Sequence, residues 1–178
     1  MTLRALLAFG LALTLSACWG SSGPLMPAAA VKPAPLSGTW VKQGTDVPGD
    51  QATYRVRLAG KVAQLEKAGK NGWDASFALS FDPLGKNLYL VQAVSPGSAN
   101  PNYVVMLVPP KAKQLQVINP ACTAEQAANW GAARSGGDCS WPDYATLRKA
   151  AIQVAQAALE KPAPGLEVAS IEYYDRQN

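Results

Sequence analysis

Short apolar segments that alternate with turn residues are the feature that most constrains the fold of this chain. Tyr54, Val56 and Leu58 alternate with Arg55 and Arg57, a pattern typical of a half-buried strand with a solvated basic face. Segments of this kind recur at near-regular spacing and predict strands at residues 39–41, 54–58, 61–66, 75–81, 88–94, 103–108 and 114–118. Short strands joined by turns predict an antiparallel meander.

Two of these segments carry further information about burial. Phe77, Leu79 and Phe81 alternate with other residues, so they are expected on one side of their strand. Residues 103–108 form a nearly continuous apolar run, which predicts a strand covered on both faces.

The pattern changes to helix after Pro120. Thr123 and Gln126 have the spacing of a capping box and predict a helix over 124–133. An apolar stripe of helical period predicts a second helix over 142–160, with a capping signature at Ser140 and Asp143, and a strand follows at 166–174. The expected fold class is therefore α+β: an antiparallel β-meander sheet packed by a C-terminal helix, with one disulfide.

The N-terminus has the order of a secretory signal peptide. Arg4 supplies one positive charge, and about ten uncharged residues follow before a group of small residues. A bilayer-spanning helix needs about 20 apolar residues, so this segment predicts a cleaved leader and not a retained anchor.

The run Leu15-Ser16-Ala17-Cys18 resembles the lipobox of bacterial lipoproteins. The resemblance implies cleavage after Ala17, a diacylglycerol on the thiol of Cys18 and acylation of its new amino group, for example with palmitate. Trp19 stands where an Asp would resemble an inner-membrane retention signal. The expected address is the bacterial cell envelope, anchored to the outer membrane and facing the periplasm. The alternative is an ordinary signal peptide with an unrelated cysteine near its end.

These features predict three regions. Residues 1–17 form the signal peptide, and residues 18–36 form a flexible tether rich in Pro, Ala, Gly and Ser after the lipidated Cys18. Residues 37–178 form a single α+β domain. Removal of 17 residues from 178 leaves 161, which suits one domain with a core.

Two cysteines remain after Cys18, namely Cys122 and Cys139. An even pair in an oxidising compartment predicts a disulfide, and the alternative is two buried free thiols. The two residues are 17 positions apart, and a loop of that size contributes about 3 kcal/mol in the chain-entropy model.

The chain contains no histidine, which excludes Ser-His-Asp and Cys-His catalytic sites and zinc sites that use histidine. We expect no catalytic residues, no metal site and no cofactor. Loss of Arg4 leaves 15 basic against 12 acidic residues, dispersed along the chain. A nucleic-acid surface is therefore not expected, because it would show a concentrated basic stripe.

The leading functional hypothesis is a non-catalytic binding or assembly module that contacts the membrane through its anchor, and an envelope protein or peptidoglycan. A hydrolase that uses carboxylates or a Ser-Lys pair is one alternative. A second follows from Gly38-Thr39-Trp40, which resembles the Gly-x-Trp that opens lipocalin-like barrels and implies a carrier of an apolar ligand.

Aromatic and acidic residues have mainly structural interpretations. Trp40 and Trp141 are expected in core packing and Trp19 at the lipid interface, while exposed tryptophans would stack on sugars. Four aspartates are expected in turns, where their side chains bond to nearby backbone: Asp46, Asp50, Asp74 and Asp82.

Overall fold

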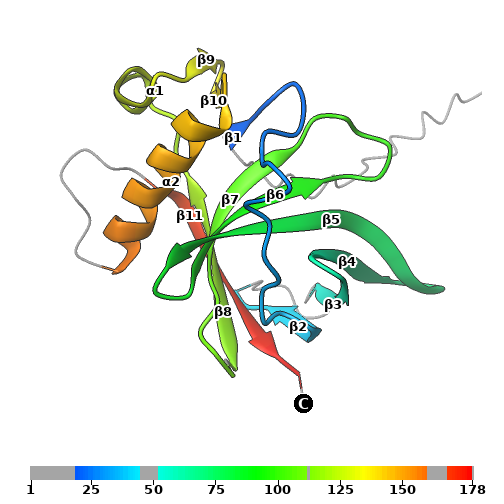
Figure 1. Cartoon of the computed structure of the whole chain (residues 1–178). Coiled ribbons are helices and arrows are strands. Elements are labelled where there is room, and N and C mark those ends of the chain that lie inside the picture. The colour runs from blue at the N-terminus through cyan, green and yellow to red at the C-terminus, as the bar shows by residue number, and fades with distance from the viewer. Residues whose placement is uncertain (1–18, 45–51, 112, 160–167, 178) are drawn as a thin grey trace, which may run out of the picture.

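The protein folds around a closed β-barrel (Figure 1). The computed structural model describes residues 19–44, 52–111, 113–159 and 168–177, and about half of these lie in strands. Eight antiparallel strands form the barrel: β2 (Gly38–Lys42), β3 (Thr53–Ala59), β4 (Val62–Gly69), β5 (Gly72–Gly85), β6 (Leu88–Val94), β7 (Asn102–Leu107), β8 (Gln114–Pro120) and β11 (Val168–Arg176).

The last strand closes the barrel. Strands β2 to β8 follow one another around the wall, each antiparallel to the next. Strand β11 then pairs with β8 on one edge and β2 on the other, so that Tyr174 lies opposite both Leu115 and Lys42. The predicted α+β fold, a meander sheet packed by a C-terminal helix, is therefore wrong. Strand alternation shows that one face is buried but not what covers it, and here the sheet covers itself.

Two separate cores result from this closure. The first lies inside the barrel and includes Trp40, Val56, Phe81, Val91 and Met106. The second lies outside the wall, between β6, β7 and β8 and two helices, α1 (Ala124–Trp130) and α2 (Tyr144–Leu159). Strand β7 separates the two cores and is covered on both faces, as its continuous apolar sequence predicted.

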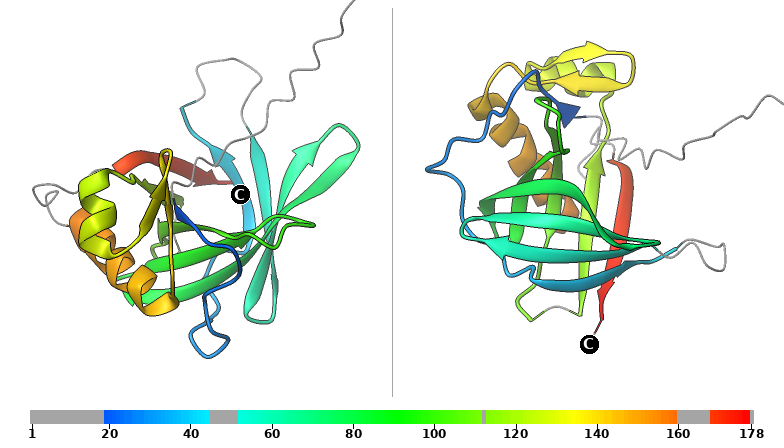
Figure 2. Two further views of the ribbon diagram at one scale, coloured as in Figure 1. Left: turned by 90° about the horizontal axis from the view of Figure 1, so that it is seen from above. Right: turned by 90° about the vertical axis from the view of Figure 1, so that its right-hand side faces the viewer.

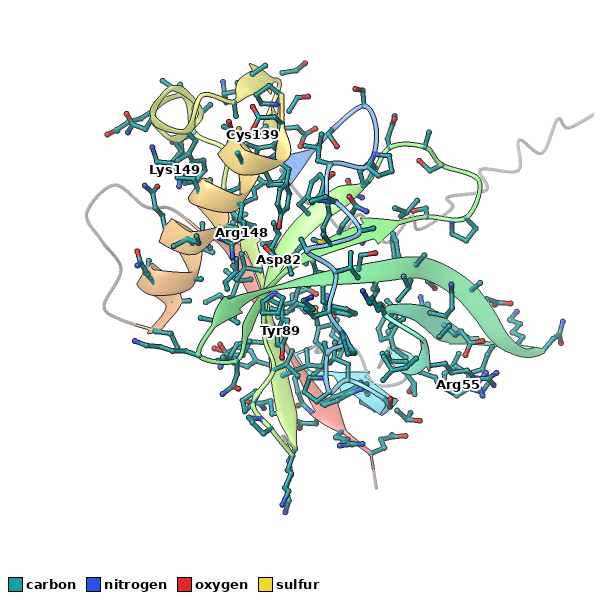
Figure 3. The ribbon with its side chains drawn as sticks, in the orientation of Figure 1. Arg55, Asp82, Tyr89, Cys139, Arg148 and Lys149 are labelled. Atoms are coloured by element: carbon teal, nitrogen blue, oxygen red, sulfur yellow. A yellow bond between two sulfur atoms is a disulfide. The ribbon has the colours of Figure 1, made fainter. Side chains whose placement is uncertain are left out.

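Helix α2 begins close to its predicted start and rests on the outer wall. The Asp143 carboxylate accepts a hydrogen bond from the backbone N–H of Thr146 at 2.8 Å and caps the helix. Asp82 is buried in β5 and not in a turn as predicted. Its Oδ2 accepts hydrogen bonds from the Tyr144 hydroxyl at 2.6 Å and from Arg148 Nε at 2.7 Å, which joins α2 to the barrel (Figure 3).

A small cap lies beside the start of α2 (Figure 1). Helix α1 has the predicted capping box at Thr123 and Gln126 but ends at Gly131, whose φ of 72° is left-handed. A hairpin replaces the last predicted turn of this helix and consists of β9 (Ala133–Ser135) and β10 (Asp138–Ser140). The short strand β1 (Trp19–Gly20) runs between β10 and the start of β7.

Residues 21–36 run along the outside of the barrel from the cap to β2 (Figure 2). The backbone N–H of Leu25 donates to Gln92 Oε1 at 3.1 Å and to the Tyr103 hydroxyl at 3.0 Å. Further along, the N–H of Lys32 donates to the carbonyl of Phe81 at 2.9 Å, and Leu36 enters the barrel core.

The prediction of a flexible tether over 18–36 does not describe residues 19–36. Proline and glycine remove regular hydrophobic periodicity, but they do not prevent an extended segment from packing on a folded wall that offers hydrogen-bond partners. Met26, Val31, Ala34 and Leu36 are all buried in this way.

Candidate functional site

The barrel interior contains an apolar cavity of about 130 Å³. Alternation along the strands directs its lining side chains inward, and Phe77 and Leu79 share the inner face of β5 as predicted. The apolar lining residues are Leu36, Trp40, Val56, Leu65, Phe77, Leu79, Val91, Ala93, Val104, Met106, Leu115 and Val117.

Polar side chains line one part of the cavity. They are Lys42, Tyr54, Ser76, Asn102, Glu172 and Tyr174. Four of them lie in the strand halves that meet at one end of the barrel, where β2 ends and β3, β5 and β7 begin. Lys42, Ser76 and Asn102 are partly exposed there. Leu36, which precedes the start of β2 at the other end, is almost fully buried, so we place the opening of the cavity at the end defined by Lys42 and Asn102, hereafter the cavity end.

Glu172 is the centre of a polar cluster on this wall. Its Oε1 accepts a hydrogen bond from Lys42 Nζ at 2.8 Å, and its Oε2 accepts one from the Tyr174 hydroxyl at 2.7 Å. The ring of Tyr54 packs edge-on against that of Tyr174, with centroids 5.8 Å apart. Three strands therefore contribute to one cluster: β2, β3 and β11.

The two tyrosines of this cluster are hydrogen-bond donors at neutral pH. Burial, followed by the hydrogen bond to Glu172 and its charge, raises the pKa of Tyr174 well above its ordinary value. Burial and the charge of Glu172 raise the pKa of Tyr54 in the same direction. Neither phenol is therefore available as a base near neutral pH.

This arrangement is suited to binding an amphipathic molecule. Lys42 uses one of its three N–H groups on Glu172, so its ammonium can donate to a further acceptor. Ser76 is the single serine among the lining residues, and its hydroxyl lies 3.5 Å from the carbonyl of Asp74. The cavity is therefore apolar over most of its wall and has charged and hydrogen-bonding groups along one side. Its lining contains no serine hydroxyl that is hydrogen-bonded to a basic side chain.

The predicted disulfide is confirmed and lies in the cap. Cys122 and Cys139 are bonded, with Cα atoms 5.5 Å apart, and they join the start of α1 to β10. Neither cysteine lines the cavity. Cys18, the predicted lipidation site, lies outside the described residues.

Four of the five tryptophans are buried. Trp40 lies in the barrel core and Trp141 in the outer core, as predicted. Trp19 was predicted at the lipid interface but is fully buried, with its ring centroid 4.7 Å from that of Trp141 and 5.2 Å from that of Trp130. Trp73 is 36% exposed and lies beside the β4–β5 turn.

Acidic residues other than Glu172 do not contribute to the cavity. Asp74 is exposed near the start of β5, and Asp82 belongs to the α2 contact. Asp46 and Asp50 lie outside the described residues. Within the described ranges, no three acidic or cysteine side chains are grouped as metal ligands.

Sequence reasoning missed the residues of the polar cluster. The spacing of Glu172 and Tyr174 places both on one face of β11, which was a usable signal. Nothing local showed that this face is the inner one, because its orientation follows from pairing with β2, about 130 residues earlier in the chain.

No helix in the described part of the chain is long and apolar enough to cross a bilayer. No protein-family model, curated protein or solved structure matches the chain.

Proposed function

We propose that this protein is a lipid-anchored envelope protein that binds a small amphipathic ligand inside its barrel. The observation that carries the proposal is the apolar cavity with Lys42 and Glu172 on its wall. Ligand sites in proteins are mostly apolar hollows with a few polar groups that fix orientation, and this cavity has that composition.

The size of the cavity limits the ligand. Its volume of about 130 Å³ is close to that of an engineered 150 Å³ cavity that binds benzene. Typical sites for drug-sized ligands occupy about 300–1,000 Å³. A single alkyl chain or one small ring matches this space, whereas a sterol does not.

The apolar contacts alone support only weak binding. At about 0.8 kcal/mol for each buried methylene group, a chain segment of about six groups gains about 5 kcal/mol. That energy corresponds to a Kd of about 0.2 mM before the costs of association. Micromolar affinity therefore requires the polar cluster to contact the polar group of the ligand.

Calorimetry with decanoate, decanol and decylamine tests this function, because the three ligands share one chain and differ in the polar group. The protein carries Cys18→Ser, so that no attached lipid competes. We expect decanoate to bind best, because Lys42 retains free N–H donors.

A cavity-filling variant makes the test specific. Ala93→Phe directs a benzene-sized group into the cavity and should abolish binding without loss of thermal stability. Gln64→Phe adds the same ring on the exposed surface of β4 and should bind normally. Unchanged binding by a folded Ala93→Phe protein would refute the cavity as the binding site.

The envelope address is a separate part of the proposal and depends on Cys18. Metabolic labelling with palmitate should mark the wild-type protein and not Cys18→Ser. Contact with an envelope protein or peptidoglycan would use the outer surface, and crosslinking in cells followed by mass spectrometry tests it independently of the cavity.

A further inference from the structure

The burial of Trp19 fixes the position at which a lipid on Cys18 would be attached. Trp19 is fully buried against Trp130 and Trp141, and β1 pairs with both β7 and β10. Cys18 directly precedes Trp19 in the sequence, and consecutive Cα atoms in a protein chain are about 3.8 Å apart. An anchor at Cys18 therefore joins the folded body directly, without a flexible spacer.

This attachment point lies beside the cavity end of the barrel. Gly20 is paired with Asn102, which is the first residue of β7 and lines the cavity. Antiparallel partners have Cα atoms up to about 5.5 Å apart. The Cα atoms of Trp19 and Asn102 are therefore at most about 9 Å apart.

The β4–β5 turn at the same end has the composition of a membrane-contacting surface. Trp73 is exposed, and the Arg55 guanidinium lies 4.4 Å from the centroid of its ring. Lys70 is exposed in the turn itself. Tryptophan is enriched at membrane interfaces, and basic residues near the surface are attracted to anionic headgroups.

The described residues around this turn carry a small net positive charge. Figure 3 shows that Arg55, which donates a hydrogen bond to Glu66 at 2.6 Å, lies on the side of the molecule away from α2. The charged side chains of β3 to β5 and their turn nearest the cavity end are three basic and two acidic: Arg55, Lys67 and Lys70, with Glu66 and Asp74.

We propose that the β4–β5 turn, through Trp73 and Lys70, docks the cavity end of the barrel on the anionic bilayer surface that holds the anchor. This inference rests on the proposed acylation of Cys18. In this orientation the opening of the cavity faces the membrane. The expected ligand is then a single-chain amphiphile that the barrel takes from the bilayer.

The test uses the acylated mature protein, beginning at Cys18, in vesicles of phosphatidylcholine with phosphatidylglycerol, with acylation verified by mass. A fluorescent label is placed at Asn71→Cys in the β4–β5 turn, or at Pro110→Cys in the β7–β8 turn at the opposite end. Aqueous iodide should quench the label at 71 several-fold less than the label at 110. In vesicles of phosphatidylcholine alone, this difference should decrease.

Two double variants then identify the docking residues. Trp73→Ala with Lys70→Glu should raise quenching at position 71 to the level seen at 110. Leu58→Ala with Lys61→Glu is the matched control. It changes an exposed apolar residue and a lysine in the β3–β4 turn, at the end of these strands away from the cavity end, and should leave quenching at position 71 unchanged.

Equal quenching at 71 and 110 on acylated, vesicle-bound protein would overturn the docking proposal alone. A mass that shows no acyl group would overturn the anchor and the docking together, while leaving ligand binding by the Cys18→Ser protein unaffected. Shielding of position 71 in native envelopes but not in pure lipid vesicles would identify a protein partner, and would also overturn the proposal.

Discussion

Replacement of Trp19 by alanine distinguishes a packed N-terminal segment from a flexible tether. Removal of a buried tryptophan typically destabilises a protein by about 3–5 kcal/mol. Trp19 is fully buried and makes two edge-on ring contacts, which supports a value in this range. Among the described residues its buried Nε1 has no hydrogen-bond partner, however, and removal of an unpaired donor returns about 1–3 kcal/mol. We therefore expect Trp19→Ala to lower the free energy of unfolding by about 2 kcal/mol.

Urea unfolding of the Cys18→Ser protein measures this change, followed by far-ultraviolet circular dichroism because tryptophan fluorescence differs between the variants. A loss of about 2 kcal/mol corresponds to a decrease in Tm of about 4–8 °C for a domain of this size. Trp73→Ala is the matched control: this side chain is 36% exposed, and its contact with Arg55 is worth about 0.5–1 kcal/mol.

If residues 19–36 were a solvated tether, Trp19→Ala would have a much smaller effect on stability. A substitution in a solvated tether changes stability by less than about 0.5 kcal/mol. If Trp19→Ala is that mild, or costs no more than Trp73→Ala, then the packing of residues 19–36 and the short path from Cys18 to the barrel are both refuted.

Three further outcomes are expected. Replacement of both Cys122 and Cys139 by serine should lower the free energy of unfolding by about 3 kcal/mol, measured against wild type with and without reductant. Asp82→Asn weakens two hydrogen bonds from α2 and should cost about 2 kcal/mol, with faster amide exchange in α2 than in the barrel. The pKa of Tyr174 is raised above its ordinary value of 10.0, so the unfolded chain loses this proton first as the pH increases. The stability that this group contributes is complete below pH 10, and above pH 10 it falls by about 1.4 kcal/mol per pH unit. Tyr174→Phe should remove this contribution from the slope of unfolding free energy against pH. An unchanged slope would show that the phenol ionises normally.

Local sequence patterns were sufficient for most individual elements. The alternation at 54–58 and 75–81 predicted strands with one inner face, and the continuous apolar run at 103–108 predicted burial on both faces. The capping box at Thr123 and Gln126 identified the start of α1. These signals act over a few residues, because side-chain direction and helix capping depend on the local backbone.

The candidate site could be predicted only in fragments. Tyr54 and Val56 were recognised as neighbours on one strand face, and Phe77 and Leu79 as neighbours on another. The ion pair of Lys42 with Glu172 joins residues 130 positions apart, and no local pattern relates them.

The sequence by itself therefore determined the eight strands of the barrel, the two helices and, through the number of cysteines, the disulfide, but not the short strands β1, β9 and β10. Tertiary structure alone decided that β11 closes the sheet into a barrel, that the helices cover its outer wall, and that residues 19–36 pack where a tether was expected. The physical reason is that periodicity records which faces of an element are buried, whereas the identity of the covering partner depends on contacts between residues far apart in the chain.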